Sequence, residues 1–240
     1  MSCLLRVEAI SKTYNTYMGW FRKDSQVALK NVSFELHEGK SLAIMGSNGS
    51  GKSTLAAIIA GAIAPTSGNV FFQDSKLLTG DYKSRAQNIR MIFQDSEASL
   101  NPHMTIGKQL QEALLFNTRL TDEQRNDLIT STLFRVGLLD EHRVFYPYMM
   151  SNGQRQRACI ARAIILNPKV LVADEALANL DTSVRAQILN LLLDLQEEFK
   201  MSYIFITHSP EIAHHMADHI LVLKDGAVER YSQTTGSLEN

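Results

Sequence analysis

The sequence predicts an α/β fold with a mixed central sheet, an N-terminal antiparallel region and an inserted helical segment. Three short, mostly apolar runs, at residues 41–45, 170–173 and 203–206, have the composition of parallel strands buried on both faces. A plausible helix follows each run, which is the order of right-handed βα units. The chain has 240 residues, of which 45% are hydrophobic. That is enough for one domain with a substantial core, so we expect residues 1–240 to form a single domain.

Patterns outside these runs predict the remaining elements. Residues 31–36 alternate between polar and apolar side chains, which predicts a half-buried antiparallel strand ahead of the first parallel one. The stretch 95–165 is mostly helical in its periodicity, and Thr121 with Gln124 forms a capping box at the start of one helix. We therefore expect an inserted helical subdomain there. The Asp-Gly pair at 225–226 is a hairpin turn signal and predicts a return to strand.

Charge, cysteine content and hydropathy exclude several classes of protein. The formal net charge is -1, so no global field attracts nucleic acid, and we expect no nucleic-acid partner. The two cysteines, Cys3 and Cys159, have neither metal-ligand nor disulfide spacing, which is typical of a reducing cytosol. The N-terminus does not resemble a secretory signal. The most apolar stretch, 55–65, falls well short of the roughly 20 residues of a membrane-spanning helix, so membrane association would require a partner.

A glycine-rich loop follows the first predicted parallel strand and matches the pattern G-x-x-x-x-G-K-[ST]. The predicted phosphate-binding residues are Gly46, Ser47, Asn48, Gly49, Ser50, Gly51, Lys52, Ser53 and Thr54. The glycines let backbone N–H groups converge on phosphate oxygens, and the helix beginning near Lys52 directs the positive end of its dipole toward them. Lys52 adds a positive charge at the β- and γ-phosphates, and the Ser53 hydroxyl is a ligand for Mg²⁺. The loop predicts a nucleotide site of the kind that GTPases, kinases and helicases share.

Two carboxylates end the apolar run at 170–173. Asp174 is expected to hold Mg²⁺ directly or through water, and Glu175 to accept a proton from, or to orient, an attacking water. The carboxyl ends of parallel strands meet at one sheet edge, where the phosphate loop also lies. Two acids at this position favour hydrolysis over binding alone.

Further motifs lie between and after the phosphate loop and the two carboxylates. Gln94 follows an apolar run, and Ser-Asn-Gly-Gln at 151–154 lies about 20 residues before Asp174. Asp181 and His208 follow the carboxylates. This order resembles that of the ABC-type ATPases, a group with the P-loop NTPase fold. The resemblance covers nearly the whole chain.

The resemblance implies a role for each of these residues. Gln94 would sense Mg²⁺ and water where the helical subdomain begins, and His208 would contact the γ-phosphate, so both join Glu175 in catalysis. Ser151 and Gly153 belong to the signature that closes over the γ-phosphate of a second subunit. Asp181 matches the Asp at the subunit interface.

Two assignments at the nucleotide depend on local patterns as well. Ser151 and Gln154 match the capping-box pattern that starts a helix. A helix N-terminus is suited to binding an anion, so Gln154 is included among the expected nucleotide-binding residues. Tyr14 resembles the aromatic residue on which adenine stacks. A role in the core is an alternative for Tyr14, and other aromatic residues nearby compete for the adenine: Tyr17, Trp20 and Phe21.

Within the family the chain looks closest to the oligopeptide and dipeptide transporter ATPases. The segments that carry this likeness are residues 92–95, 99–102 and 104–106. Residues 19–22, 80–82 and 173–181 resemble the Sap (antimicrobial-peptide resistance) branch. The resemblance implies an ATP- and Mg²⁺-dependent ATPase that powers solute transport, with peptides as the expected solute. It also implies membrane permease subunits and a second ATPase subunit, different or identical, at the cytoplasmic face of the inner membrane, with this chain as a peripheral protein.

Alternatives and departures from the family pattern remain. The alternatives are a soluble ABC ATPase without a membrane partner, and transport of polyamines in place of peptides. Asn152 stands where the signature usually has its first glycine, and residues 176–177 replace the common Pro-Thr. Because glycine can adopt a positive φ and lets the backbone approach a phosphate, we expect Asn152 to weaken the site that this signature completes.

Overall fold

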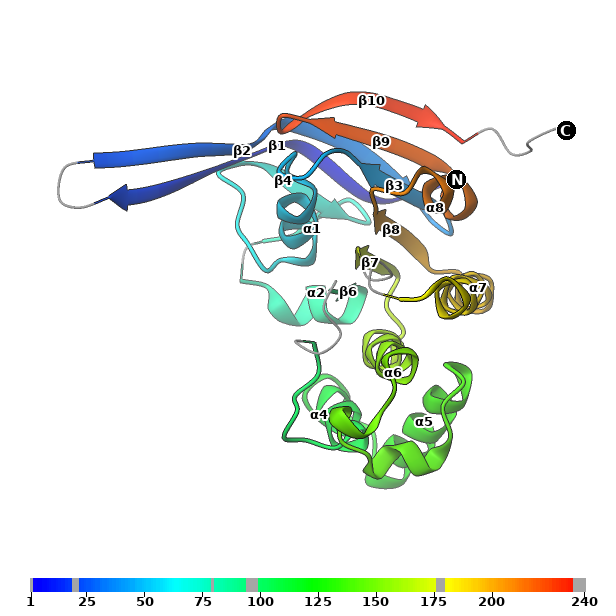
Figure 1. Ribbon diagram of the computed structural model, residues 1–240. Helices are drawn as coiled ribbons and strands as arrows, with labels where there is room; N and C mark the ends of the chain where they lie inside the picture. Colours follow the sequence, from blue (N-terminus) through cyan, green and yellow to red (C-terminus); the bar gives the residue numbers. More distant parts are fainter. Residues whose placement is uncertain (1, 19–21, 79, 94–98, 176–179, 235–240) are drawn as a thin grey trace, which may run out of the picture. The chain divides into compact units, whose positions relative to one another are not determined.

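A computed structural model describes residues 2–18, 22–78, 80–93, 99–175 and 180–234 of the protein (Figure 1). The chain divides into two compact units, the first made of Met1–Arg85 with Ser202–Asn240 and the second of Ala86–Met201. Gln94 and residues 176–179 lie outside the described residues. Within the described residues, no helix is both long and apolar enough to cross a membrane.

The first unit contains a four-stranded antiparallel sheet in the order β2-β1-β4-β5 (Figure 1). Its strands are β1 (Cys3–Met18), β2 (Arg22–His37), β4 (Ser67–Phe72) and β5 (Ser75–Lys76). Val32, Phe34 and Leu36 are buried and alternate with exposed neighbours, which confirms the half-buried strand predicted at 31–36. The β1–β2 pairing runs the full length of both strands, so this hairpin is much longer than the predicted segment.

A mixed set of strands forms the second sheet layer of the first unit. It consists of β3 (Ser41–Met45), β8 (Ser202–Ile206), β9 (His219–Lys224) and β10 (Ala227–Gln233). β3 pairs in parallel with β8 on one side and with β9 on the other, and β10 pairs with β9 in antiparallel orientation. The turn between β9 and β10 has positive φ at Asp225 and Gly226, as the sequence predicted. The mixed sheet and the antiparallel sheet confirm the predicted α/β class.

Two helices of the first unit are α1 (Lys52–Ala60) and α8 (Pro210–Met216). α1 buries Leu55, Ile58 and Ile59 completely. Its C-terminal end is fixed by Arg85, whose guanidinium donates to the carbonyl oxygens of Ile58 (3.0 Å) and Ile59 (2.7 Å). The helix whose first residue is Lys52 is therefore held at its far end by a buried cation, a favourable partner for a helix C-terminus.

The second unit combines two parallel strands with a group of helices. Its strands are β6 (Ile89–Ile92) and β7 (Val170–Asp174), which pair in parallel. Its helices are α4 (Ile106–Asn117), α5 (Asp122–Arg135), η1 (Asp140–Val144), η2 (Pro147–Met149), α6 (Asn152–Ile164) and α7 (Thr182–Phe199). α2 (Tyr82–Asn88) carries the chain from the first unit into the second. Elements described between residues 106 and 164 are all helical.

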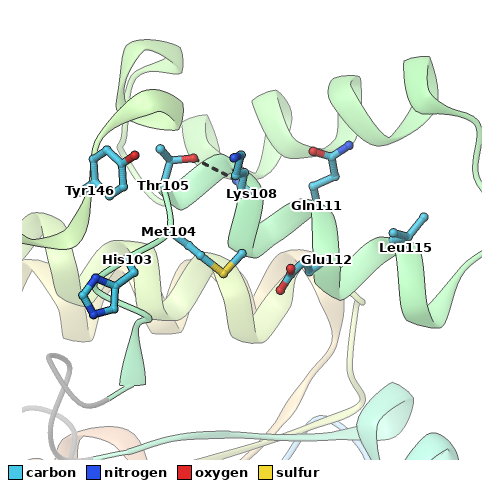
Figure 2. Close-up of a pocket in the computed structure, with 8 residues that line it drawn as sticks. All are labelled: His103, Met104, Thr105, Lys108, Gln111, Glu112, Leu115 and Tyr146. Atoms are coloured by element: carbon cyan, nitrogen blue, oxygen red, sulfur yellow. Dashed lines mark hydrogen bonds between the residues drawn. The ribbon is translucent and has the colours of Figure 1, made fainter.

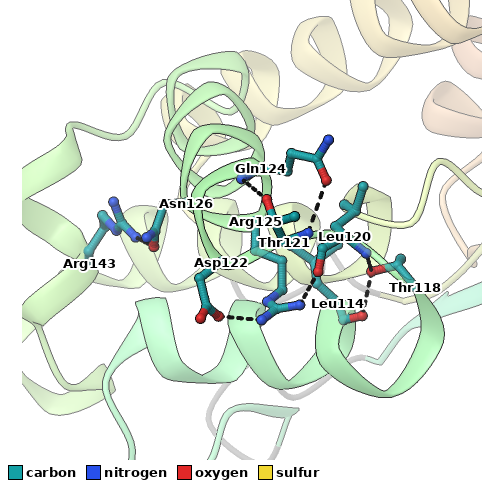
Figure 3. Close-up of polar contacts among 9 residues, drawn as sticks. All are labelled: Leu114, Thr118, Leu120, Thr121, Asp122, Gln124, Arg125, Asn126 and Arg143. Carbon is teal, nitrogen blue, oxygen red and sulfur yellow. Dashed lines mark hydrogen bonds and ion pairs between the residues drawn. The ribbon is translucent and has the colours of Figure 1, made fainter.

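The connection between α4 and α5 shows how local hydrogen bonds fix these helices (Figure 3). Thr118 ends α4 by donating its hydroxyl to the carbonyl oxygen of Leu114 at 2.7 Å. Thr121 and Gln124 then form the predicted capping box, with the Thr121 N–H donating to Gln124 Oε1 at 2.9 Å. Arg125 adds a bond to the Leu120 carbonyl oxygen. At the start of α5 the Gln124 side chain thus pairs a backbone N–H that the helix itself leaves without a partner, and at the end of α4 the Thr118 hydroxyl is a second donor to the Leu114 carbonyl oxygen.

Candidate functional site

The loop between β3 and α1 needs glycine at two positions for different steric reasons. Gly46 has φ 148°, and a Cβ there would lie 2.2 Å from the Leu223 carbonyl oxygen. Gly51 has φ 101°, and its Cβ would lie 2.4 Å from the Ala28 carbonyl oxygen. Both contacts are with backbone, which cannot move aside as a flexible side chain can. The loop is therefore pressed against neighbouring strands and leads directly into the N-terminus of α1.

This N-terminus has the features of an anion site. Gly51 is the N-cap of α1 and has no side chain with which to cap the N–H groups of the first turn, which is the arrangement of an anion-binding helix N-terminus. Lys52 is only 5% exposed, and its Nζ donates to the carbonyl oxygens of Gly46 (2.9 Å) and Ser47 (3.0 Å). An ammonium group has three donors, and within the described part of the chain these two bonds account for two of them. The buried hydroxyl of Ser50 has no hydrogen-bond partner within the described structure.

Tyr14 lies near the same helix. Its hydroxyl is 3.5 Å from the Thr54 hydroxyl in the first turn of α1, and the Lys12 ammonium lies 5.1 Å from its ring centroid. The Tyr14 side chain is 37% exposed, so it is not a core residue, and that alternative for Tyr14 is wrong. Of its competitors, Trp20 and Phe21 lie outside the described residues.

His208 is presented at the same sheet edge as the glycine-rich loop. It follows β8, and the Thr207 N–H continues the β3–β8 ladder by donating to the Ile44 carbonyl oxygen at 3.3 Å. The glycine-rich loop begins at Gly46, two residues after Ile44. Gly46 therefore follows the end of β3, and His208 follows the end of the neighbouring parallel strand β8. His208 is exposed, and Ser209 caps α8 immediately after it.

In the second unit, the paired acids end strand β7 as predicted. Asp174 is the last strand residue and is 9% exposed. Glu175 follows with φ 44°, a left-handed conformation that costs a residue with a side chain about 1 kcal/mol or more. Strain of this kind persists only where surrounding structure enforces it, and it concentrates at functional sites. The backbone conformation here fixes the direction in which the Cα–Cβ bond of Glu175 leaves the chain.

The Ser-Asn-Gly-Gln segment forms the start of α6. Ser151 is the N-cap, and the predicted capping box with Gln154 is present, with the Ser151 N–H donating to Gln154 Oε1 at 2.9 Å. Gly153 is closely packed, because a Cβ there would lie 3.1 Å from Val184 Cγ1 in α7, a side-chain atom that would have to shift slightly. Asn152 is a helical residue, and its Oδ1 accepts from the Arg155 guanidinium. The capping box at Ser151 starts the helix at Asn152, so ordinary helical geometry applies there and glycine's access to positive φ gives no reason for Asn152 to weaken the site. The expected weakening through hindered approach of the backbone to a phosphate stays a prediction.

Asp181 is the N-cap of α7. Its Oδ1 accepts from the Val184 N–H at 2.9 Å, so one carboxylate oxygen already has a structural function. The structure therefore places the predicted residues in two groups. The first unit brings together the loop at 46–54, Tyr14 and His208, and the second contains Asp174, Glu175, Asp181 and the Ser151 helix start.

Comparison with known proteins agrees with these features. Residues 29–178 match the ABC transporter family. The chain belongs to the ABC transporter family. It is 49% identical to the putrescine export system ATP-binding protein SapF of Escherichia coli (strain K12), over 98% of this chain and 88% of that protein. It is 44% identical to the dipeptide transport ATP-binding protein DppF of the same organism, over 92% of this chain and 67% of that protein.

Solved structures give the same result for the fold of this ABC ATPase. A dimeric ATP-binding cassette in a post-hydrolysis state, bound to ADP and Pi, is 32% identical and superposes with a TM-score of 0.85, over 98% of this chain and all of that one. The predicted ABC ATPase fold is confirmed. ATP binding and ATP hydrolysis are therefore activities of this chain.

One residue near the signature was not predicted from the sequence. His142, in η1, is 6% exposed, and its Nε2 lies 3.1 Å from Gln154 Nε2. Histidines are common at helix ends, and the local sequence around residue 142 contains no motif. The contact joins residues 12 positions apart in the chain through a turn, and only the three-dimensional structure reveals it.

Proposed function

We propose that this chain is the ATPase subunit of an ABC transporter for peptides, acting beside a second ATPase subunit and attached to membrane permeases at the cytoplasmic face of the inner membrane. The observation that carries the proposal is the uncapped N-terminus of α1 with buried Lys52, in a chain whose family binds and hydrolyses ATP.

The phosphates of ATP are held by the loop at 46–54. Its backbone N–H groups and Lys52 supply positive charge, and the unpartnered Ser50 hydroxyl supplies one more donor. The adenine ring stacks on Tyr14, whose contact with Thr54 places it near the start of α1. The Ser53 hydroxyl, the Asp174 carboxylate and the Gln94 amide are the oxygen ligands that suit Mg²⁺, which neutralises developing charge on the phosphates when bound.

Hydrolysis needs a base, and we assign that role to Glu175, which follows the end of β7. Its carboxylate accepts a proton from, or orients, the water that attacks the γ-phosphate. Gln94 helps to position that water, and His208 contacts the γ-phosphate from the end of β8. The left-handed backbone at Glu175 supports this assignment, because strained backbone of this kind concentrates at functional sites.

The signature of this chain serves the nucleotide of a second ATPase subunit. Ser151, Gly153 and Gln154 form a helix start that can receive a γ-phosphate, and Asp181 lies at the start of α7, which packs against Gly153. The family's dimeric cassettes support a paired arrangement. Whether the second subunit is another copy or a different ATPase, each composite site takes its phosphate loop from one subunit and its signature from the other.

The second unit also offers a surface for a permease. A pocket of about 410 Å³ lies along α4, and Figure 2 shows the side chains that line it. Its lining residues are His103, Met104, Thr105, Lys108, Gln111, Glu112, Leu115 and Tyr146. Leu115 is 53% exposed, and Tyr148, which is stacked on Tyr146, is 72% exposed. Exposed apolar and aromatic side chains around a hollow are typical of a protein-binding surface.

Peptides are the proposed transported solute because several similar proteins are named for peptide or dipeptide transport. Proteins named peptide transport system ATP-binding protein SapF are 48–49% identical to this chain, and dipeptide transport proteins named DppF are 43–44% identical. The Escherichia coli K12 SapF carries the name of a putrescine export protein at the same 49% identity. Polyamine transport is therefore a second candidate.

The deciding experiment is transport by the assembled complex in liposomes. We expect ATP-dependent movement of labelled peptides, abolished when Lys52→Ala is introduced into this chain. Movement of putrescine without peptide would replace the peptide proposal with the polyamine one. ATP hydrolysis by a chain that binds neither permease would favour the soluble ATPase.

A further inference from the structure

Gln109, in α4, is a buried polar residue whose side-chain amide is bonded to the backbone ahead of the helix. It is 7% exposed. Its Oε1 accepts from the Asn101 N–H at 2.9 Å, and its Nε2 donates to the carbonyl oxygens of Asn101 and Met104, each at 3.0 Å. A backbone N–H can only donate and a carbonyl oxygen can only accept. These partners therefore fix which way the amide of Gln109 points.

Asn101 and Met104 are the two ends of one tight turn. The Met104 N–H donates to the Asn101 carbonyl oxygen at 3.2 Å, and Asn101 Oδ1 accepts from the His103 N–H at 3.0 Å. Pro102 occupies the second position of the turn, where its fixed φ is favourable. These features define the internal shape of the turn. Gln109 adds a bond from α4 to each end of the turn, and so fixes the position of the turn against the helix.

Apolar packing alone would hold this segment less specifically. Leu100, before the turn, and Ile106, after it, are buried. Contacts between apolar side chains are non-directional, so they tolerate small shifts of the backbone between these two residues. Hydrogen bonds to a side chain in one orientation do not, because each bond weakens steeply as its geometry departs from the optimum. Gln109 is therefore the residue that sets where the turn lies on α4.

The turn forms one wall of the pocket that we propose for a permease (Figure 2). His103 and Met104 line the pocket from the turn. The residues that line it from α4 are Lys108, Gln111, Glu112 and Leu115. The bonds of Gln109 join these two walls, so they determine how the turn and the helix are placed around the pocket.

We propose that Gln109 is a positioning residue for the permease surface of this chain. It holds the turn at 101–104 against α4, and so holds the Met104 side chain where a permease segment binds against it. A pocket whose walls are already in place loses less conformational freedom on binding, and therefore binds more tightly. This inference rests on the proposed role of the pocket as the permease surface. Gln109 acts through the turn.

Two substitutions of Gln109 remove its bonds to the turn. Gln109→Met loses all three hydrogen bonds and keeps a side chain of similar length that fills the buried space. Gln109→Glu keeps the test available if Gln109→Met does not fold, since its carboxylate still accepts from the Asn101 N–H but cannot donate to the two carbonyl oxygens. Thermal unfolding and ATP affinity of each isolated subunit show whether the two compact units are folded.

The main measurement is the affinity of the ATPase subunit for the permease subunits of the transporter in lipid nanodiscs. We expect Gln109→Met and Gln109→Glu each to weaken this affinity about tenfold, because backbone groups at the turn lose buried partners and the turn shifts. ATP affinity of the isolated subunit should stay at the wild-type value, since the phosphate loop belongs to the other compact unit. Wild-type permease affinity in both folded variants would overturn the inference.

Substitutions in the two walls separate positioning from a general loss of stability. Met104→Ala shortens a side chain on the turn, and Leu115→Ala is the matched change on α4. We expect each to weaken permease binding about fivefold in the wild-type background. In the Gln109→Met background, the effect of Met104→Ala should fall below about twofold, because that side chain is no longer held in place. Leu115→Ala should keep its full effect there.

An equal effect of Met104→Ala in both backgrounds would overturn the inference. Loss of the Leu115→Ala effect together with that of Met104→Ala would do the same, because Gln109 would then support the helix as a whole. Failure of the proposed permease surface gives a different result. Neither Met104→Ala nor Leu115→Ala would then change permease affinity in the wild-type background, and the inference would fall with that surface.

Discussion

Replacing Lys52 is the sharpest test of the phosphate loop. Two substitutions can separate the effect of its ammonium charge from the effect of its buried hydrocarbon stem. The ammonium group contributes a charge-assisted hydrogen bond to phosphate worth about 1.5–3 kcal/mol. Its loss should weaken ATP binding by about 10- to 150-fold. Lys52→Ala also removes three methylenes from a side chain that is 5% exposed, which should destabilise the fold by about 2 kcal/mol.

Lys52→Met is the matched control, since it keeps most of the buried stem and removes only the charge. We expect both variants to lose ATP affinity to the same extent in a nucleotide titration, while only Lys52→Ala shows a clearly lower melting temperature. ATP affinity equal to wild type in a folded Lys52→Met protein would refute the assignment of this loop. Lost affinity in Lys52→Ala with retention in Lys52→Met would mean that bulk, and not charge, is what the loop needs.

Three other substitutions have expected outcomes. Gly51→Ala should lower the free energy of unfolding by about 2–4 kcal/mol, because φ is 101° and the new Cβ would lie 2.4 Å from the Ala28 carbonyl oxygen. Gly49→Ala is the control: φ is 80° and no atom lies within 4 Å of the new Cβ, so chemical denaturation should show a loss of only about 1 kcal/mol. Equal costs would contradict the close approach. Tyr14→Ala should weaken ATP binding by about fivefold or more while Tyr14→Phe does not, if the ring stacks on adenine; equal affinities would remove Tyr14 from the site. Asn152→Gly, in a complex whose Lys52 site is blocked, should raise the remaining ATPase activity, since the Asn side chain obstructs approach to the helix start; an unchanged rate would make Asn152 a neutral substitution.

The buried parallel strands were predictable because their signal is local. Residues 41–45 form β3 with the predicted bounds, and β7 and β8 differ from the predicted runs by one residue each. A continuous apolar run of this length, followed by a helix, has few structural interpretations other than a buried parallel strand. The long hairpin of β1 and β2 was not predicted at its full length, since its outer part contains polar residues such as Asn15 and Asp24 without an apolar alternation.

Some local features of the candidate site were predicted from the sequence, whereas a contact between side chains distant in the sequence was not. The capping box of Ser151 and Gln154 was predicted and is present. The same capping box implies a helical φ at Asn152, so the argument from glycine's freedom to adopt positive φ was applied at a position that does not need it. The contact between His142 and Gln154 could not be predicted, because the two residues are 12 positions apart and no sequence motif includes residue 142.

The most direct test of the account is phosphate release by the assembled complex carrying Glu175→Gln in this chain. The amide can still hydrogen-bond water but cannot take its proton, so we expect ATP affinity close to wild type, turnover at the site built on Lys52 reduced by about 100-fold or more, and accumulation of an ATP-bound dimer. Wild-type phosphate release from that site in the variant would contradict the assignment of Glu175 and, with it, the proposed mechanism of hydrolysis.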